Sequence, residues 1–210
     1  MAKLCENGIC TPKGFQASGI HCGIRKNRTK KDLALIYSEV PCNAAATYTL
    51  NKVKGAPIAV TKQHLQDGKA QAIICNSGNA NTCNANGVEI ATQMCALCAD
   101  ALQLASEDII VASTGVIGEP LSIDPFATHM QELVTKLSYE GGSDACEGIM
   151  TTDTFKKEFA VSFLLDGKEC HIGGMAKGSG MIHPNMATML AFLTSDVAIS
   201  SEMLDEVVHE

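Results

Sequence analysis

Residues 175–194 carry the densest set of side chains that could do chemistry. They open with a glycine-rich turn around one lysine (residues 177–180, KGSG) and lead to Thr188, which follows the small residue Ala187 and precedes a short apolar run. Cleavage before Thr188 would leave an α-amine and a hydroxyl on one residue. An α-amine, with a pKa of about 8, can take the hydroxyl proton that otherwise makes threonine a poor nucleophile. The pattern predicts an N-terminal threonine nucleophile.

Such a nucleophile needs hydrogen-bond donors aimed at the oxyanion that forms during acyl transfer. Residues 113–118 (STGVIG) follow a short apolar run, and their glycines let backbone N–H groups approach a substrate closely. Thr114 and Gly115 are the candidate donors. Each feature also has an ordinary interpretation: a strand threonine, a turn or helix cap, a solvated Lys177, and a structural His183 before proline. Residue types and spacing alone leave both interpretations open.

The elements that must position these residues alternate between strands and helices, which predicts an α/β fold. Asp124-Pro125 is a plausible cap and first position of a helix, and another helix starts near Ser200 or Ser201 and still runs at Glu210. We therefore expect the sequence to be a piece of a longer chain. Strands are predicted at 33–37, 70–75, 108–112, 159–165, 170–176 and 189–193, a strand or a turn into one at 44–50, and helices at 88–104 and 123–137.

Composition indicates a globular protein, with 46% apolar and 19% charged residues and length for one domain or two small ones. The net charge of −7 gives no general reason to expect nucleic acid. The basic segment (residues 25–31) fits a solvated turn better than a phosphate or nucleic-acid patch, because no aromatic residues interrupt it. The sequence has neither a long apolar run nor a secretory signal, so we expect a cytoplasmic protein outside the membrane.

The ten cysteines are scattered through apolar or small-residue contexts. A disulfide scaffold would need a secreted chain, which the polar N-terminus argues against. The one C-x-x-C pair, Cys95 and Cys98, falls within a helical pattern and has no second pair or histidine partner at metal-ligand spacing. Core packing is the favoured interpretation, with a metal or redox pair as the alternative.

Several stretches, taken in order through nearly the whole chain, resemble the ornithine acetyltransferase family of glutamate N-acetyltransferases. The most specific of them resembles the family's cleavage signature. The stretches are 12–15, 31–35 followed by 51–57, 76–81, 113–118, 150–154, and 177–182 with 184–190.

The resemblance implies a layered α-β-β-α-type sandwich of the kind found in self-processing transferases and aminopeptidases, with its C-terminal part missing. It also implies self-cleavage between Ala187 and Thr188, which gives an α chain of residues 1–187 and the truncated start of a β chain, residues 188–210. Thr188 would take the acetyl group from N2-acetyl-L-ornithine and pass it to L-glutamate in a ping-pong cycle of arginine biosynthesis.

By the same resemblance, Thr114 and Gly115 would stabilise the oxyanion, while Thr151 and Lys177 would bind substrate. A lysine suits this role because acetylornithine and glutamate both carry α-carboxylates. No metal or organic cofactor is implied, and acetyl-CoA is a candidate second acetyl donor. The partners implied are the two small-molecule substrates and an α2β2 heterotetramer. Family members complete the pocket with later β-chain residues, so we expect these 210 residues to be inactive alone.

Two alternatives belong to other functional classes. One is a self-processing amidohydrolase or aminopeptidase, which would use Thr188 in the same way but pass the acyl group to water. The other is a non-catalytic globular domain in which Thr188 is an ordinary strand residue. Lys177 and Thr151 favour the transferase, because both would serve to hold an amino-acid substrate.

Overall fold

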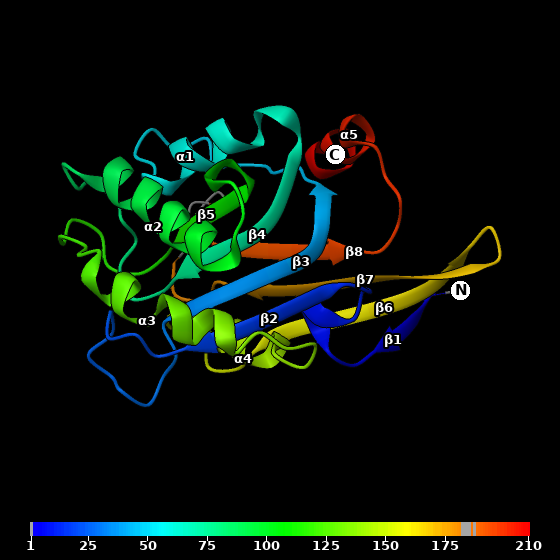
Figure 1. The fold of residues 1–210 in the computed structure, drawn as a ribbon, viewed down its shortest axis with the longest axis horizontal. Coiled ribbons are helices and arrows are strands. Elements are labelled where there is room, and N and C mark those ends of the chain that lie inside the picture. The colour runs from blue at the N-terminus through cyan, green and yellow to red at the C-terminus, as the bar shows by residue number, and fades with distance from the viewer. Residues whose placement is uncertain (1, 182–185, 187) are drawn as a thin grey trace.

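The computed structural model describes residues 2–181, 186 and 188–210, and its strands form two four-stranded sheets (Figure 1). The first sheet has the order β2-β3-β4-β5, with β2 (Phe15–Ile20), β3 (Leu33–Asn43), β4 (Lys69–Asn76) and β5 (Ile109–Ser113). The second sheet has the order β1-β6-β7-β8, with β1 (Lys3–Cys5), β6 (Lys157–Leu165), β7 (Lys168–Lys177) and β8 (Leu190–Ser195).

The first sheet is buried on both faces, which explains the continuous apolar run at the start of β3. Its pairs are antiparallel except β4 and β5, which run parallel and are joined by a crossover through α2 (Gly87–Leu102). The parallel register places Asn76 opposite Ser113, so both strands end at the same edge of the sheet. The loops that follow these two strands therefore start side by side.

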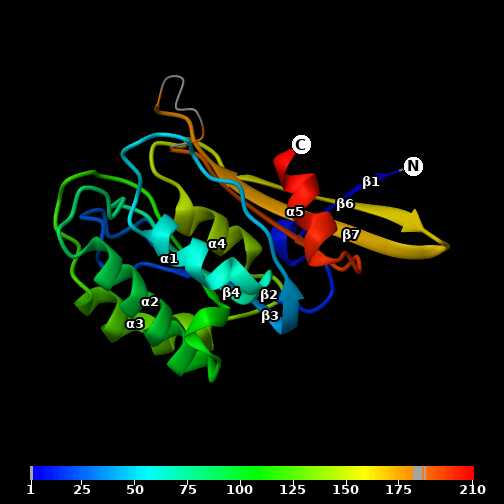
Figure 2. The ribbon, with the colours of Figure 1, turned by 90° about the horizontal axis from the view of Figure 1, so that it is seen from above.

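Helices cover one face of the first sheet, and Figure 2 shows them on the side away from the second sheet. This layer consists of α1 (Pro57–His64), α2 and α3 (Asp124–Thr135), and it shares one apolar core with the sheet. Met94 of α2 and Phe126 of α3 are fully buried there. None of the helices in the described ranges is long and apolar enough to span a membrane.

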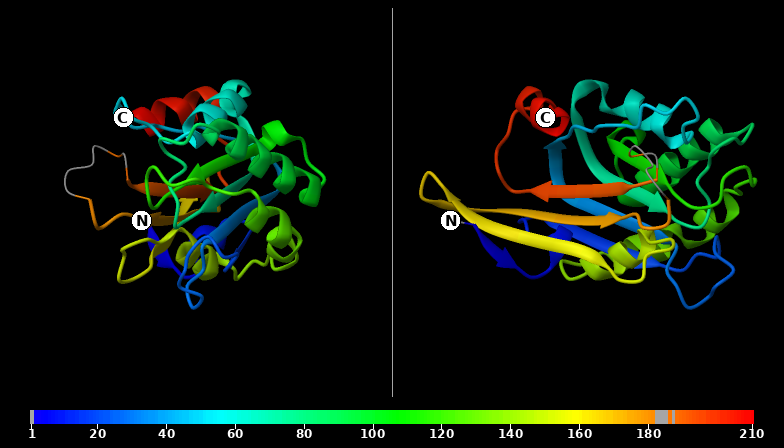
Figure 3. Two further views of the ribbon diagram at one scale, coloured as in Figure 1. Left: turned by 90° about the vertical axis from the view of Figure 1, so that its left-hand side faces the viewer. Right: turned by 180° about the vertical axis from the view of Figure 1, so that it is seen from behind.

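The other face of the first sheet packs against the second sheet, with α4 (Gly142–Ile149) between them. Ile36 of β3, Ile149 of α4 and Met175 of β7 contribute to this second core. Of the expected sandwich, the described residues thus form one helical layer and both sheets. The β6–β7 hairpin extends beyond the rest of the second sheet (Figure 3, right).

Most predicted elements are confirmed, with shifts of a few residues at their ends. The hairpin prediction for β6 and β7 is confirmed, and its turn residues Asp166 and Gly167 both have positive φ, as a two-residue Asp-Gly turn requires. The helix predicted from Ile123 begins at Asp124, with Ile123 as its cap, and α5 (Ser201–His209) has Ser200 as its cap, accepting a hydrogen bond from the Met203 amide. The basic segment connects β2 and β3, as the turn interpretation predicted.

The strand predicted at 44–50 is wrong, because β3 ends at Asn43 and no regular element follows before α1. Four elements were not predicted: β1, β2, α1 and α4. They are short, and α4 contains two glycines, which weaken a helical pattern read from sequence. Tertiary contacts form them, since β1 exists by pairing with β6, and α4 by packing on β2 and β3.

The core-packing interpretation of the C-x-x-C pair is confirmed. Cys95 and Cys98 are fully buried in the core of the helical layer. Burial raises the pKa of each thiol to about 12. All ten cysteines are free thiols, and Cys83 is an exposed one.

Gly19 of β2 gives a test of the packing between the first sheet and α4. A Cβ at this position would collide with the backbone carbonyl of Asp144 at the start of α4. We expect Gly19→Ala to lower the free energy of unfolding by about 3 kcal/mol, because backbone must move. Urea unfolding followed by circular dichroism measures this. Gly167→Ala is the control, since its Cβ meets no atom within 4 Å and should cost only about 1 kcal/mol for its positive φ.

Candidate active site

A buried lysine brings together three residues that the sequence had singled out. Lys177, the last residue of β7, donates hydrogen bonds from Nζ to the Thr114 hydroxyl at 3.0 Å and to the Thr188 carbonyl at 3.1 Å. Lys177 is 3% exposed and Thr114 4% exposed. Lys177 is therefore not a solvated turn residue, because its ammonium is buried between the segment that holds Thr188 and the segment that holds Thr114.

Strand ends place these groups. Thr114 follows β5 directly, and Lys177 pairs with Leu190, the first residue of β8, two positions after Thr188. The two sheets pack face to face, so the end of β5 in one sheet meets the β7–β8 edge of the other. Ala187 and His183 lie outside the described residues. Of the two residues that flank the expected cleavage site, the structure therefore describes only Thr188. Thr188 itself is half-buried.

Gly115 packs directly on the asparagine-rich loop (residues 76–81). Its φ is +135°, and a Cβ there would collide with the backbone of Gly78. Thr114 N–H donates to Asn76 O at 3.0 Å, and Val116 N–H donates to Gly78 O at 3.2 Å. Only glycine fits a position with both this φ and this contact.

These bonds refine which atoms can face an oxyanion. We expected backbone N–H groups of the segment to be available, but the Thr114 N–H is already bonded to Asn76. The Thr114 hydroxyl accepts a hydrogen bond from Lys177, so its own proton remains to be donated. The Gly115 N–H makes no hydrogen bond within the part of the chain that the structure describes. The candidate donors are thus the Thr114 hydroxyl and the Gly115 amide.

Thr151 joins the cluster through Asp153, a residue that we had not singled out. The Asp153 carboxylate accepts hydrogen bonds from the amide of Thr151 at 3.3 Å and from the amide of Gly178, the neighbour of Lys177, at 2.9 Å. It also forms an ion pair with Lys157. The available signal was its place in the stretch 150–154, one of the stretches that resemble the family.

Charge and burial oppose one another at Lys177 and Asp153. Burial lowers the pKa of Lys177, while Asp153 raises it in part. Burial alone would raise the pKa of Asp153, but hydrogen bonds from Lys157, Gly178 and Thr151 outweigh it and hold the pKa at about 2. Asp153 is therefore ionised at neutral pH and helps to keep the Lys177 ammonium charged.

Within the described ranges, no three histidine, cysteine, aspartate or glutamate side chains are grouped so that they could hold a metal ion. The cluster itself offers an ammonium, a hydroxyl, a backbone amide and a threonine just before the start of a strand. These groups suit acyl transfer, in which a carbonyl is attacked and a negative oxygen must be stabilised.

Comparison with known proteins identifies the family of this chain. Residues 16–210 match the family model described as the ArgJ family. The chain belongs to the ArgJ family. It is 48% identical over 205 residues to the arginine biosynthesis bifunctional protein ArgJ of Caldanaerobacter subterraneus subsp. tengcongensis, covering 97% of this chain and 50% of that protein. It is 46% identical over 208 residues to the ArgJ protein of Listeria monocytogenes, covering 98% of this chain and 51% of that protein.

The chain thus spans about half the length of the curated ArgJ relatives that it matches. Among solved structures, the ArgJ protein from Bacillus halodurans superposes with a TM-score of 0.82 at 40% identity, covering 90% of this chain and 98% of that chain. The ornithine acetyltransferase of Mycobacterium tuberculosis, solved in complex with ornithine, has a TM-score of 0.81 at 34% identity, covering 90% of this chain and 100% of that chain.

A more distant likeness bears on the fold alone. An aminopeptidase from Ochrobactrum anthropi, described as a variant of the Ntn hydrolase fold, has a TM-score of 0.55 at 13% identity and covers 97% of this chain and 66% of that chain. The expected likeness to the fold of ornithine acetyltransferases and aminopeptidases is confirmed by this structure together with the ArgJ structures.

Asp153 predicts a pH dependence of stability. Because its pKa in the folded protein is about 2, below the value of about 4 in an unfolded chain, the carboxylate contributes stability above about pH 4 that is lost as the pH falls towards 2. The difference corresponds to about 2 kcal/mol. We expect Asp153→Asn to be less stable than wild type at pH 6 by about this amount, and the gap to narrow by pH 3.

Urea unfolding of the 210-residue chain at pH 3, 4, 5 and 6 measures that gap. Asp205→Asn is the matched control, because Asp205 has a side chain 67% exposed on α5. A gap between Asp153→Asn and wild type that stays constant from pH 6 to 3 would contradict the role given to the carboxylate.

Proposed function

We propose that the full-length protein transfers the acetyl group of N2-acetyl-L-ornithine to L-glutamate through an acetyl ester on Thr188. The observation that carries the proposal is the buried Lys177 ammonium bonded to both Thr114 and Thr188. Lys177 brings the proposed nucleophile, Thr188, next to the proposed oxyanion donor, Thr114, and is itself a cation suited to a carboxylate. The names of the ArgJ relatives and the ornithine complex of the tuberculosis enzyme support the choice of substrate.

The proposed cycle begins after cleavage between Ala187 and Thr188. The new α-amine takes the hydroxyl proton as Thr188 Oγ1 attacks the acetyl carbonyl, and the Thr114 hydroxyl and Gly115 amide donate to the oxyanion. Collapse of the tetrahedral intermediate breaks the amide C–N bond. The protonated α-amine of Thr188 returns its proton to the departing amine of ornithine. The amine of glutamate then attacks the acetyl ester, so that N-acetylglutamate leaves and the hydroxyl is restored.

Lys177 and Thr151 are the proposed substrate-binding residues. A charged ammonium in a buried site binds an α-carboxylate more strongly than an exposed one would, because water screens it less. Both substrates carry that group, which explains how one site can accept them in turn. The remaining contacts to substrate are assigned to the half of the protein beyond these residues.

Chain coverage supports self-cleavage. The solved ArgJ chains are covered almost completely by this sequence, whereas the curated relatives are covered only by half. A polypeptide divided near its middle gives this pattern. We propose on this basis an α chain of residues 1–187 and a β chain beginning at Thr188. From the resemblance to the family we also propose an α2β2 assembly, and from the sequence a cytoplasmic location. The proposed cycle needs no metal or organic cofactor, and acetyl-CoA is a proposed second donor.

Thr188→Ala tests the nucleophile and the cleavage together. In the full-length gene product, we expect the wild type to give two polypeptides, the second beginning at Thr188, and the variant to give one. We expect acetyl transfer to fall at least about a thousandfold, because no other hydroxyl replaces the nucleophile. Intact-mass spectrometry and N-terminal sequencing measure cleavage. Thr188→Ser is the matched control and should retain part of both, and a Thr188→Ala protein that is still cut and active contradicts the mechanism.

Glutamate dependence separates the transferase from a self-processing amidohydrolase, which the likeness to the aminopeptidase fold makes the second candidate. We expect acetylornithine alone to be consumed slowly, and glutamate to speed its consumption with one N-acetylglutamate formed per ornithine. Mass spectrometry of both products measures this. Free acetate released at the full rate without glutamate assigns the protein to the hydrolases. Replacing acetylornithine by acetyl-CoA in the same assay tests the second donor.

A further inference from the structure

The basic segment (residues 25–31) contains one arginine that a solvated turn does not explain. Lys26, Arg28 and Lys30 are exposed, but Arg25 is half-buried. Its side chain points back into the molecule, towards the loops of the candidate active site. The proposed function assigns it no role.

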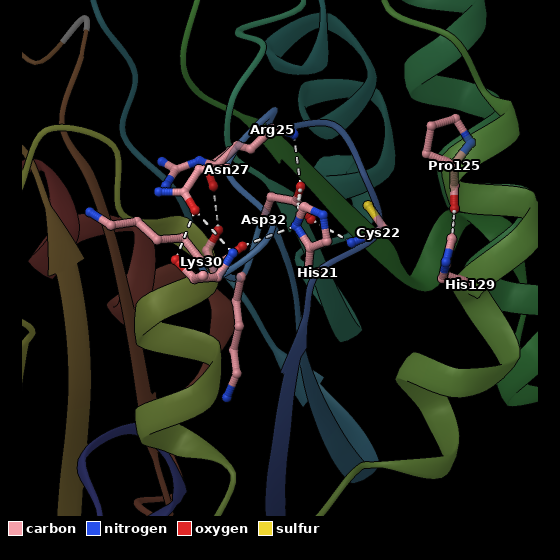
Figure 4. A network of polar contacts seen from close by, with 12 residues as sticks. His21, Cys22, Arg25, Asn27, Lys30, Asp32, Pro125 and His129 are labelled. Atoms are coloured by element: carbon pink, nitrogen blue, oxygen red, sulfur yellow. Dashed lines mark hydrogen bonds and ion pairs between the residues drawn. The ribbon is translucent and has the colours of Figure 1, made fainter.

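Asp32 holds the backbone at the start of this segment. Its buried carboxylate accepts hydrogen bonds from the amide of Cys22 at 2.6 Å and from the amide of Arg25 at 2.8 Å, and it pairs with His21 at 3.1 Å (Figure 4). Its carbonyl accepts a hydrogen bond from the amide of Ser77, in the asparagine-rich loop, at 2.9 Å. One fully buried residue therefore ties the base of Arg25 to the loop that supports Gly115.

The Arg25 side chain contacts two loops of the site. A Cβ placed on Gly78 would lie 2.8 Å from Arg25 Cγ, so the aliphatic stem packs on the loop that Gly115 touches. The guanidinium donates a hydrogen bond to the carbonyl of Met150, immediately before Thr151. Arg25 thus lies between the oxyanion side and the substrate side of the cluster.

We propose that Arg25 is a positioning residue for acyl transfer, which fixes the stretch around Thr151 against the loop that carries Gly78 and supports Gly115. This inference rests on the proposed function, because it takes Thr151 and Gly115 as parts of one site. Arg25 acts through these residues and not by contact with the reacting atoms. A displacement of about 1 Å between such groups is enough to cost a large part of the rate.

Charge gives the proposal a second consequence. Burial lowers the pKa of Lys177; Asp153 and Cys75 raise it, and Arg25 and Lys157 lower it further. Removing the Arg25 charge therefore raises the pKa of Lys177, which then keeps its proton to higher pH. This shift follows from the loss of the Arg25 charge alone, so it reports on the closeness of Arg25 to Lys177, whereas kcat and amide exchange report on positioning.

The test compares Arg25→Met, which keeps the stem without the guanidinium, with Arg25→Lys, which keeps the charge. Arg28→Met, on the same segment but exposed, is the control. In the full-length gene product we expect Arg25→Met to lower kcat about tenfold. The alkaline limb of its kcat/KM profile should move to higher pH. Arg25→Lys should lower kcat but keep the limb in place, and Arg28→Met should match wild type in both.

Two readouts on the full-length gene product do not need activity. Hydrogen exchange of the amides at 150–154 should quicken in Arg25→Met, and the NMR titration of Lys177, assigned with Lys177→Gln, should move to higher pH. Unchanged exchange, titration and kcat in Arg25→Met overturn the proposal, even if its melting temperature falls. If Arg25→Met does not fold, Arg25→Lys replaces it in the test, and unchanged amide exchange together with an unchanged kcat in Arg25→Lys overturns the proposal. If wild type transfers no acetyl group, the proposed function falls and the catalytic part of this inference falls with it, whereas amide exchange still decides whether Arg25 holds the two loops together.

Discussion

The burial of one ammonium constrains the whole site. A charged lysine removed from water is stable only where oxygen atoms replace its hydration and a negative charge lies near. Lys177 finds these in the Thr114 hydroxyl, the Thr188 carbonyl and the nearby Asp153 carboxylate. Thr114 follows β5 directly, Thr188 lies in the loop between β7 and β8, and Asp153 lies in the loop between α4 and β6. The packing of the two sheets therefore keeps a protonated Lys177 stable in the interior. Loss of this packing between the sheets would expose the ammonium to solvent or make it lose its proton.

The second constraint is a direct contact between two backbone segments at glycines, where neither residue has a side chain. Gly115 lies against Gly78, and neither position has room for a Cβ. This brings the loop after β5 onto the loop after β4, which parallel pairing had already placed at the same edge. The Gly115 amide keeps its orientation because the amides on either side of it, those of Thr114 and Val116, are bonded to that loop. Preorganised donors of this kind contribute to catalysis because they need no rearrangement as charge develops.

Sequence reasoning located most of the site but not the contacts that join it. Thr114, Gly115, Lys177 and Thr188 came from motifs whose residue types suggest their chemistry, Thr151 came from the family resemblance, and the structure places them in one cluster or next to it. Arg25 was missed because its partners, Gly78 and Met150, are distant in sequence, and Asp153 was missed because its link to Lys177 runs through the distant amide of Gly178. The same limit applies to the fold, since long periodic elements such as α2 were predicted and α4, formed by packing on two strands, was not.

The buried thiols have a practical meaning for experiments on this protein. Alkylating reagents attack the thiolate form of cysteine. Cys75, Cys95 and Cys98 are buried and their raised pKa keeps them protonated, so they react slowly, whereas Cys83 is exposed to solvent. Modification of a core thiol therefore requires local opening of the structure around it. The rates at which single cysteines react can then report separately on how often the helical layer and the space between the sheets open, as a chemical counterpart of local unfolding free energies.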